Sequence, residues 1–101
     1  MVKVVYEADE NHYLTLEVSG HAEAGEYGND LICASVSSIV FGLMNALDAL
    51  EKEIDIEVYE NLISIDIHEV SDITDNYMEL VMIQLKTIEE SYGDFIKVER
   101  K

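Results

Sequence analysis

Two segments near the start of the chain are predicted to be strands, and the second of them alternates between apolar and polar residues. They are residues 2–9 and 12–18, which flank the polar pair Glu10-Asn11. The apolar positions of the second segment include Leu14, Leu16 and Val18. Because side chains alternate between the two faces of a strand, a period of two predicts a β-hairpin with one buried face.

A second hairpin is predicted further along the chain. Residues 54–59 and 62–68 flank another polar pair, Glu60-Asn61. The residues expected to face inward from the second of these strands are Ile63, Ile65 and Ile67. Residues 94–99 are predicted to form a short closing strand.

Two longer segments have helical patterns. Residues 30–51 are apolar around most of the circumference of a helix, so we expect this helix to be largely buried, in the middle of the fold or at a dimer interface. We expect Phe41 and Met44 to lie in the protein core. Close packing of another backbone would explain the glycine at Gly42. Residues 73–92 predict a helix with a single apolar stripe and Leu80 beside it, ending near Gly93. That stripe consists of Tyr77, Val81, Leu85, Ile88 and Tyr92.

The resulting element order is ββαββαβ. Hairpins pair their strands antiparallel, so the order predicts an α+β fold in which antiparallel hairpins pack with two helices. The chain has 101 residues and no proline, and no composition shift marks a linker. We therefore expect residues 1–101 to form a single domain.

Composition narrows the class of protein. With 49% hydrophobic residues the chain is expected to be globular despite a formal net charge of −16. Such an acidic chain is unsuited to binding phosphate backbones directly, and its acidity is either a solubility trait or an attraction for a basic partner. We find no signal peptide and no long apolar span, so no membrane association is expected. A single cysteine excludes an internal disulfide and indicates the reducing cytoplasm.

That cysteine, Cys33, is placed in the first turn of the first helix. If Asp30 is the N-cap, the unpaired N–H groups and positive end of the helix dipole stabilise a thiolate at this position. His21 lies at the end of the preceding strand and is a candidate general base. Ser37 follows Cys33 by four residues, on the same helix face. Asp30 itself opposes thiolate formation, unless it caps the helix or orients His21. By spacing alone, a buried and inert cysteine remains a competing interpretation.

The connecting loop carries glycines at Gly25 and Gly28, after Gly20 at the strand end. We expect this small, polar loop to close over a bound peptide. Its N–H groups, together with those of the first helical turn, are candidate oxyanion donors.

Two runs of residues resemble a known family. Gly20-His21-Ala22 and the decapeptide from Gly28 to Ser37 are similar to the signature of the ribosomal-processing cysteine proteases. The resemblance covers the whole chain in length and element order, and its specific part is confined to residues 20–37. The family's catalytic histidine and cysteine match His21 and Cys33, and its aspartate and serine match Asp30 and Ser37.

The resemblance implies an activity and partners that the residues alone do not name. It implies a cofactor-independent cysteine endopeptidase that removes the N-terminal extension of a large-subunit ribosomal protein, the twenty-seventh in the standard series, by cutting after an aromatic residue. It also implies a homodimer. The substrate would be a basic ribosomal protein, whose charge is opposite to that of this chain.

Three alternatives remain open. A non-catalytic acidic dimer could bind a basic ribosomal partner during ribosome assembly, with Cys33 as a packing residue. A thiol sensor is a second alternative, but the chain has no second cysteine to resolve an oxidised thiol. A zinc site would need Cys33 to converge with His12, His21 and His68, which have no compact ligand spacing. His12 and His68 are otherwise interpreted as surface residues.

Overall fold

The computed structural model describes residues 1–20 and 29–101; the side chains of Asn29 and Asp30 are also outside this description. Its elements follow the predicted order ββαββαβ. They are β1 (Val2–Ala8), β2 (Tyr13–Ser19), α1 (Asn29–Asp48), β3 (Ile54–Val58), β4 (Leu62–Ile67), α2 (Asp72–Tyr92) and β5 (Ile96–Arg100).

The strands form one mixed sheet in the order β3-β4-β2-β1-β5. Both predicted hairpins are confirmed, since β1 pairs antiparallel with β2 and β3 pairs antiparallel with β4. β2 and β4 join the hairpins through another antiparallel pairing. β5 lies parallel to β1, because α2 returns the chain to the end of the sheet at which β1 begins. The predicted α+β class is therefore confirmed, with one parallel pair added to the antiparallel hairpins.

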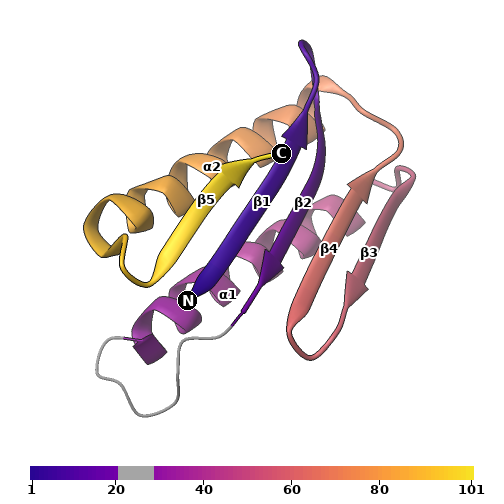
Figure 1. Ribbon diagram of the computed structural model, residues 1–101. Helices are drawn as coiled ribbons and strands as arrows, with labels where there is room; N and C mark the ends of the chain where they lie inside the picture. The colour runs from indigo at the N-terminus through magenta and orange to yellow at the C-terminus, as the bar shows by residue number, and fades with distance from the viewer. Residues whose placement is uncertain (21–28) are drawn as a thin grey trace.

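Both helices cover the same face of the sheet (Figure 1). The alternating strand residues point their apolar members at this helix layer, which closes the core. The strand residues buried there are Val2, Val4, Leu16, Val18, Ile65, Ile67 and Ile96. The start of β1, the end of β2, the β3–β4 turn and the start of α1 meet at one end of the molecule (Figure 1).

α1 buries one stripe of side chains. The buried residues recur every three or four positions, as expected for one helix face: Ile32, Val36, Val40, Leu43 and Leu47. Leu31 is 66% exposed and Phe41 is 43% exposed. The expectation that this helix is largely buried is therefore wrong for the single chain, because its own sheet covers only one side. The core assignment of Phe41 is wrong for the same reason. A Cβ atom on Gly42 would meet nothing within 4 Å, so no backbone packs on Gly42 within the described residues.

The same helix corrects a second expectation. The segment Leu31–Asp48 has a mean hydropathy of 1.7. By length and composition alone, it is long and apolar enough to cross a membrane. The statement that the sequence holds no long apolar span was therefore too strong. Core helices of globular proteins also pass this test, and here the buried stripe of α1 packs on the sheet of its own chain.

α2 begins at a capping box formed by Ser71 and Thr74. Its buried residues are Thr74, Met78, Val81, Met82 and Leu85. The predicted stripe is thus correct at its centre and wrong at its edges, since Leu80 is 57% exposed and Tyr92 is 49% exposed. The helix ends before Gly93, as predicted, but Gly93 has a φ of −60°, which any residue adopts, rather than the left-handed conformation that favours glycine.

Candidate active site

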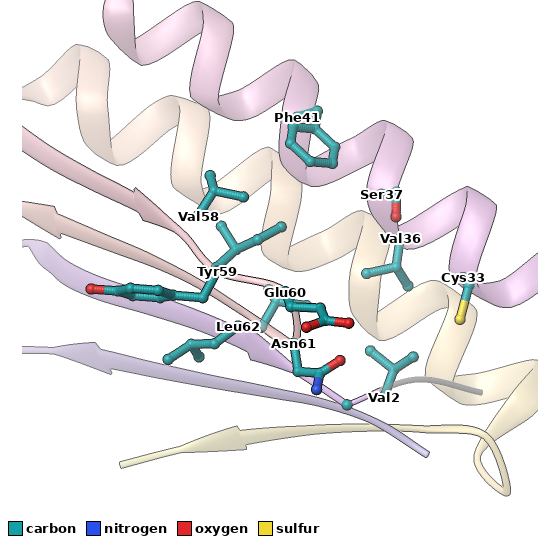
Figure 2. Close-up of a pocket in the computed structure, with 13 residues that line it drawn as sticks. Val2, Cys33, Val36, Ser37, Phe41, Val58, Tyr59, Glu60, Asn61 and Leu62 are labelled. Atoms are coloured by element: carbon teal, nitrogen blue, oxygen red, sulfur yellow. The ribbon is translucent and has the colours of Figure 1, made fainter. Parts of the chain in front are cut away.

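A cleft of about 160 Å³ lies where α1 faces the β3–β4 turn. One wall is formed by α1 through Cys33, Ser37 and Phe41. The opposite wall is the turn itself, residues 59–61 (Figure 2). The floor is apolar and is formed by Val2, Val18, Val36, Val58, Leu62 and Ile63, and Gly20 also lines the cleft. The structure therefore gathers three of the sequence-predicted site residues, Gly20, Cys33 and Ser37, around one opening.

Cys33 is half-buried and packs against the hydrophobic core while lining the cleft. Figure 2 shows its sulfur projecting from α1 on the side of the cleft. Because α1 begins at Asn29, Cys33 is its fifth residue rather than a member of its first turn. The same boundary makes Asp30 the second helical residue, so its predicted N-cap position is wrong by two residues. The dipole argument for thiolate stabilisation is correspondingly weaker, since the field falls off beyond the first turn.

Ser37 follows Cys33 by one helical turn and is exposed in the same cleft. The prediction that the two residues share a helix face is therefore confirmed. The hydroxyl group lies on the wall that a bound peptide would contact, and it can both donate and accept a hydrogen bond.

Gly20 holds the end of β2 in a conformation that favours glycine. Its φ is +82°, and a Cβ atom would collide with the backbone carbonyl oxygen of Met1. Its N–H donates to the carbonyl oxygen of Asn61 at 3.3 Å. The strand end that leads into His21 is thus fastened to the β3–β4 turn.

Several predicted site residues lie outside the description. His21, Gly25 and Gly28 fall in residues 21–28, and the side chain of Asp30 is also outside the described part of the chain. The His21–Cys33 pairing and the closing loop therefore stay predictions.

The two described histidines lie elsewhere, each beside a carboxylate. His12 Nδ1 donates to Asp75 Oδ2 at 2.6 Å, and this hydrogen bond raises the pKa of His12 above its ordinary value of 6.5. His68 Nε2 donates to Asp55 Oδ2 at 2.7 Å, which raises the pKa of His68 in the same way. Neither histidine lines the cleft. In residues 1–20 and 29–101, no three histidine, cysteine or acidic side chains converge as metal ligands.

Sequence reasoning missed the second wall of the cleft. Glu60 and Asn61 were interpreted only as turn residues, and Phe41 only as core. The register of β2 with β4 brings this turn to the site, because Ser19 pairs with Leu62. No local pattern in the sequence specifies that pairing, so the strand order was needed to find Glu60.

Comparison with known proteins gives consistent matches along the chain. A family model described as cysteine protease Prp matches residues 1–97. The ribosomal processing cysteine protease Prp of Staphylococcus aureus is 34% identical over 97 residues, covering 92% of each chain. The protein of the same name from Bacillus subtilis is 35% identical over 94 residues, covering 84% of this chain and 83% of its own.

Solved structures agree with these sequence matches. An essential ribosomal processing protease Prp from S. aureus, in complex with a substrate peptide, superposes with a TM-score of 0.86 at 27% identity over the full length of both chains. The S. aureus protease with a covalently linked product peptide gives a TM-score of 0.83 at 29% identity, again over both full chains.

Proposed function

The chain belongs to the cysteine protease Prp family, and we propose that it is an endopeptidase with Cys33 as nucleophile and His21 as general base. The observation that carries this proposal is the position of the chain's only cysteine, half-buried on α1 at the wall of a cleft. The S. aureus structure with a covalently linked product peptide supports covalent chemistry in a close relative. A cysteine used only for packing would have no need to line an opening.

The proposed mechanism follows from these groups. His21 takes the proton of Cys33, and the thiolate attacks the carbonyl carbon of the scissile bond. The C–N bond then breaks, and the leaving amine takes the proton from the imidazolium of His21. Water, activated by His21, adds to the thioester, and the C–S bond breaks to release the acid and restore the thiol. The unpaired N–H groups at the start of α1 are candidate donors to the oxyanion.

Ser37 and Asp30 take supporting roles in this proposal. Ser37, exposed one turn after Cys33, positions the peptide on the wall of the cleft. Because α1 begins before Asp30, the role that remains for this carboxylate is to orient His21.

The proposed substrate is the N-terminal extension of a large-subunit ribosomal protein, the twenty-seventh in the standard series, removed before or during ribosome assembly in the cytoplasm. The names of the curated relatives support ribosomal processing, and the S. aureus complex supports a peptide substrate. The net charge of −16 suits a basic substrate. The apolar floor of the cleft suits the aromatic residue that the family resemblance implies at the cut.

Mass spectrometry of the precursor after incubation with the protein tests this function. We expect Cys33→Ala and His21→Ala to abolish cleavage while the far-UV spectrum and thermal midpoint stay near those of the parent. Ser35→Ala is the matched control, because Ser35 is exposed on α1 two residues from Cys33 and donates to the carbonyl oxygen of Leu31, at 2.8 Å. Retained cleavage in either active-site variant would disprove the dyad. Binding of the precursor without cleavage by the parent would instead favour the non-catalytic acidic dimer.

We also propose that two copies of the chain form a homodimer through the outer surface of the helix layer. A groove of about 450 Å³ runs between α1 and α2 and includes Ile39, Gly42, Ala46, Tyr77 and Leu80. The unfilled space over Gly42 and the exposed side chain of Leu80 would accept apolar side chains of a second copy. This occupant explains why α1 is apolar on the side that its own sheet leaves uncovered.

Light scattering after size-exclusion chromatography measures this association. Leu80→Glu places a charge in the groove and should give monomers at concentrations where the parent is dimeric. Ile83→Glu is the matched control, because Ile83 is 53% exposed and Leu80 57%, but Ile83 lies outside the groove. Equal masses for the parent and Leu80→Glu would rule out this face.

A further inference from the structure

We propose that Glu60 is a specificity-determining residue that selects a lysine or arginine within about three residues of the scissile bond. The proposal rests on the proposed peptidase function, and it assigns a role to the wall of the cleft opposite Cys33. It concerns only described residues, on α1 and on the β3–β4 turn.

The length of the cleft sets how much peptide it holds. Cys33, Ser37 and Phe41 line it at intervals of four residues along α1. At 1.5 Å per residue, the distance from the first to the third is about 12 Å along the helix axis. An extended peptide rises about 3.3 Å per residue, so the same length holds roughly three to four substrate residues. A substrate side chain that meets Glu60 is therefore close in sequence to the bond at Cys33.

The chemistry of the turn wall favours a cation. Glu60 brings a carboxylate to a cleft whose floor is formed by valine, leucine and isoleucine side chains. Figure 2 shows Glu60 and Asn61 side by side on the wall that faces α1. Three ion pairs are formed by the described residues, and none of them includes Glu60. A lysine or arginine of the substrate would gain this partner, and the apolar part of its side chain would cover the floor.

The backbone fixes Glu60 relative to the reacting residues. Tyr59 N–H donates to the carbonyl oxygen of Leu62 at 2.7 Å, which closes the turn around Glu60 and Asn61. Asn61 in turn accepts from Gly20 N–H, at the strand end that leads into His21. Glu60 is thus carried on a short closed turn tied directly to the site. A residue held in this way can discriminate between substrate positions, which a long-range field cannot do.

A charge-swap experiment tests this role. Peptides carry lysine, glutamine or glutamate at each of the three positions on either side of the cleavage site, and kcat/KM is measured for the parent, Glu60→Gln and Glu60→Lys. At one position we expect the parent to prefer lysine over glutamine by about three- to five-fold, the size of a solvent-exposed ion pair. Glu60→Gln should lose this preference at that position only, and Glu60→Lys should prefer glutamate there.

Glu10→Lys is the matched control. Glu10 is followed by an asparagine in the β1–β2 turn, as Glu60 is in the β3–β4 turn, but it lies at the opposite end of the sheet (Figure 1). Glu10→Lys changes the net charge by the same amount as Glu60→Lys. It should therefore leave the preference at every peptide position as in the parent. If the parent and Glu60→Lys cut all the peptides with the same relative rates, the proposed role of Glu60 in specificity is wrong. Absence of cleavage by the parent would instead count against the peptidase function itself.

Discussion

His12 and its neighbours fasten the β1–β2 turn to the start of α2. Asp75 accepts from His12 Nδ1 through one carboxylate oxygen, and from the backbone N–H of Tyr13 through the other, at 3.0 Å. Tyr13 also donates its hydroxyl to Glu79 on the next turn of α2. Burial and this carboxylate raise the pKa of Tyr13 to about 12. A histidine interpreted from sequence as a solvated turn residue is therefore part of a polar contact between hairpin and helix.

The two histidine–aspartate pairs predict separate titrations. Both hydrogen bonds raise the imidazole pKa, so NMR should place the midpoints of His12 and His68 above 6.5. Asp75→Asn should lower the midpoint of His12 and leave that of His68 unchanged, and Asp55→Asn should do the reverse. Each variant thus serves as the control for the other. If Asp75→Asn leaves the titration midpoint of His12 unchanged, the hydrogen bond between His12 and Asp75 does not persist in solution.

The same shift gives a pH dependence of stability with a defined sign. A histidine whose pKa is higher in the folded state stabilises the fold when protonated, fully at pH values below the unfolded value near 6.5. This contribution is lost as the pH rises through the folded pKa. Urea denaturation of the parent and of His12→Gln should therefore differ most below pH 6.5 and converge above the folded pKa.

Gly20→Ala should damage both stability and cleavage. The left-handed φ of +82° costs a non-glycine residue on the order of 1 kcal/mol, and the collision with the Met1 carbonyl adds to this. We expect a loss of at least about 2 kcal/mol in the free energy of unfolding, measured with urea. Gly93→Ala is the control, because its φ of −60° suits any residue and its Cβ would lie 3.2 Å from the carbonyl oxygen of Glu89, a tight contact that still costs less than the collision at Gly20. Equal losses in the two variants would contradict the special role of Gly20.

At the scale of elements, local hydrogen bonds fix the start of α2. Ser71 Oγ accepts from Thr74 N–H at 3.2 Å, while Thr74 Oγ1 accepts from Ser71 N–H at 3.0 Å. Thr74 is fully buried, so its hydroxyl depends on these partners. Asp72 and Asp75 add negative charge in the first turn, where the helix dipole favours it.

Ser71→Ala should lower the free energy of unfolding by about 1 kcal/mol, because it removes an N-cap acceptor. Ser35→Ala removes a serine hydroxyl from the surface of α1, where alanine has the higher helix propensity, and should leave stability unchanged or slightly raised. Urea denaturation of the two variants makes the comparison. An equal effect of both substitutions would mean that the capping box contributes nothing beyond an ordinary surface hydroxyl.

The elements could be predicted from the sequence because their signals are local. Leu16 and Val18 alternate with polar residues in β2, and Ile65 and Ile67 do so in β4, and all four are buried. The placement of Cys33 and Ser37 on one wall of the cleft also followed from helical spacing alone. The boundaries were less accurate: α1 begins two residues earlier than an N-cap at Asp30 implies, which places Cys33 beyond the first turn.

At the scale of the whole molecule, the strand order could not be predicted. β5 pairs with β1, its most distant strand in sequence, and this contact depends on the packing of α2 rather than on any residue in residues 94–99. The turn at Glu60 reaches the site only because β4 pairs with β2. For the same reason Phe41 was assigned to the core, since its exposure depends on which side of α1 the sheet covers.

One face of the sheet carries several carboxylates, together with the exposed lysines Lys3 and Lys97. β2, β3 and β4 carry exposed carboxylates on the side away from the helix layer, at Glu17, Asp55, Glu57 and Asp66. Asp55 and Asp66 occupy paired positions, so the repulsion between them is offset only in part by the hydrogen bond from His68. These carboxylates are one part of the net charge of −16, to which exposed residues of α2 such as Asp72, Glu79 and Glu90 also contribute.

The net negative charge should affect the rate at which the chain meets its substrate. If the substrate is a basic ribosomal protein, opposite charges steer the encounter, which can raise association rates by about 10- to 1,000-fold and weakens as salt rises. At about 0.15 M salt the Debye length is roughly 8 Å, so most long-range steering is screened. We expect kcat/KM for the full-length basic precursor to fall steeply with added salt while kcat changes little, since the bound complex is the same.

A short neutral peptide with the same cleavage sequence supplies the comparison, and its kcat/KM should depend far less on salt. The same field repels ribosomal RNA, so precursor in solution should be cut faster than precursor already assembled into a ribosomal subunit. If kcat/KM depends equally on salt for the two substrates, the acidity of the chain contributes to solubility and not to substrate encounter. Faster cleavage on the assembled subunit would contradict the repulsion and would place processing after assembly. Contacts with the ribosome itself would then have to outweigh the repulsion from a net charge of −16.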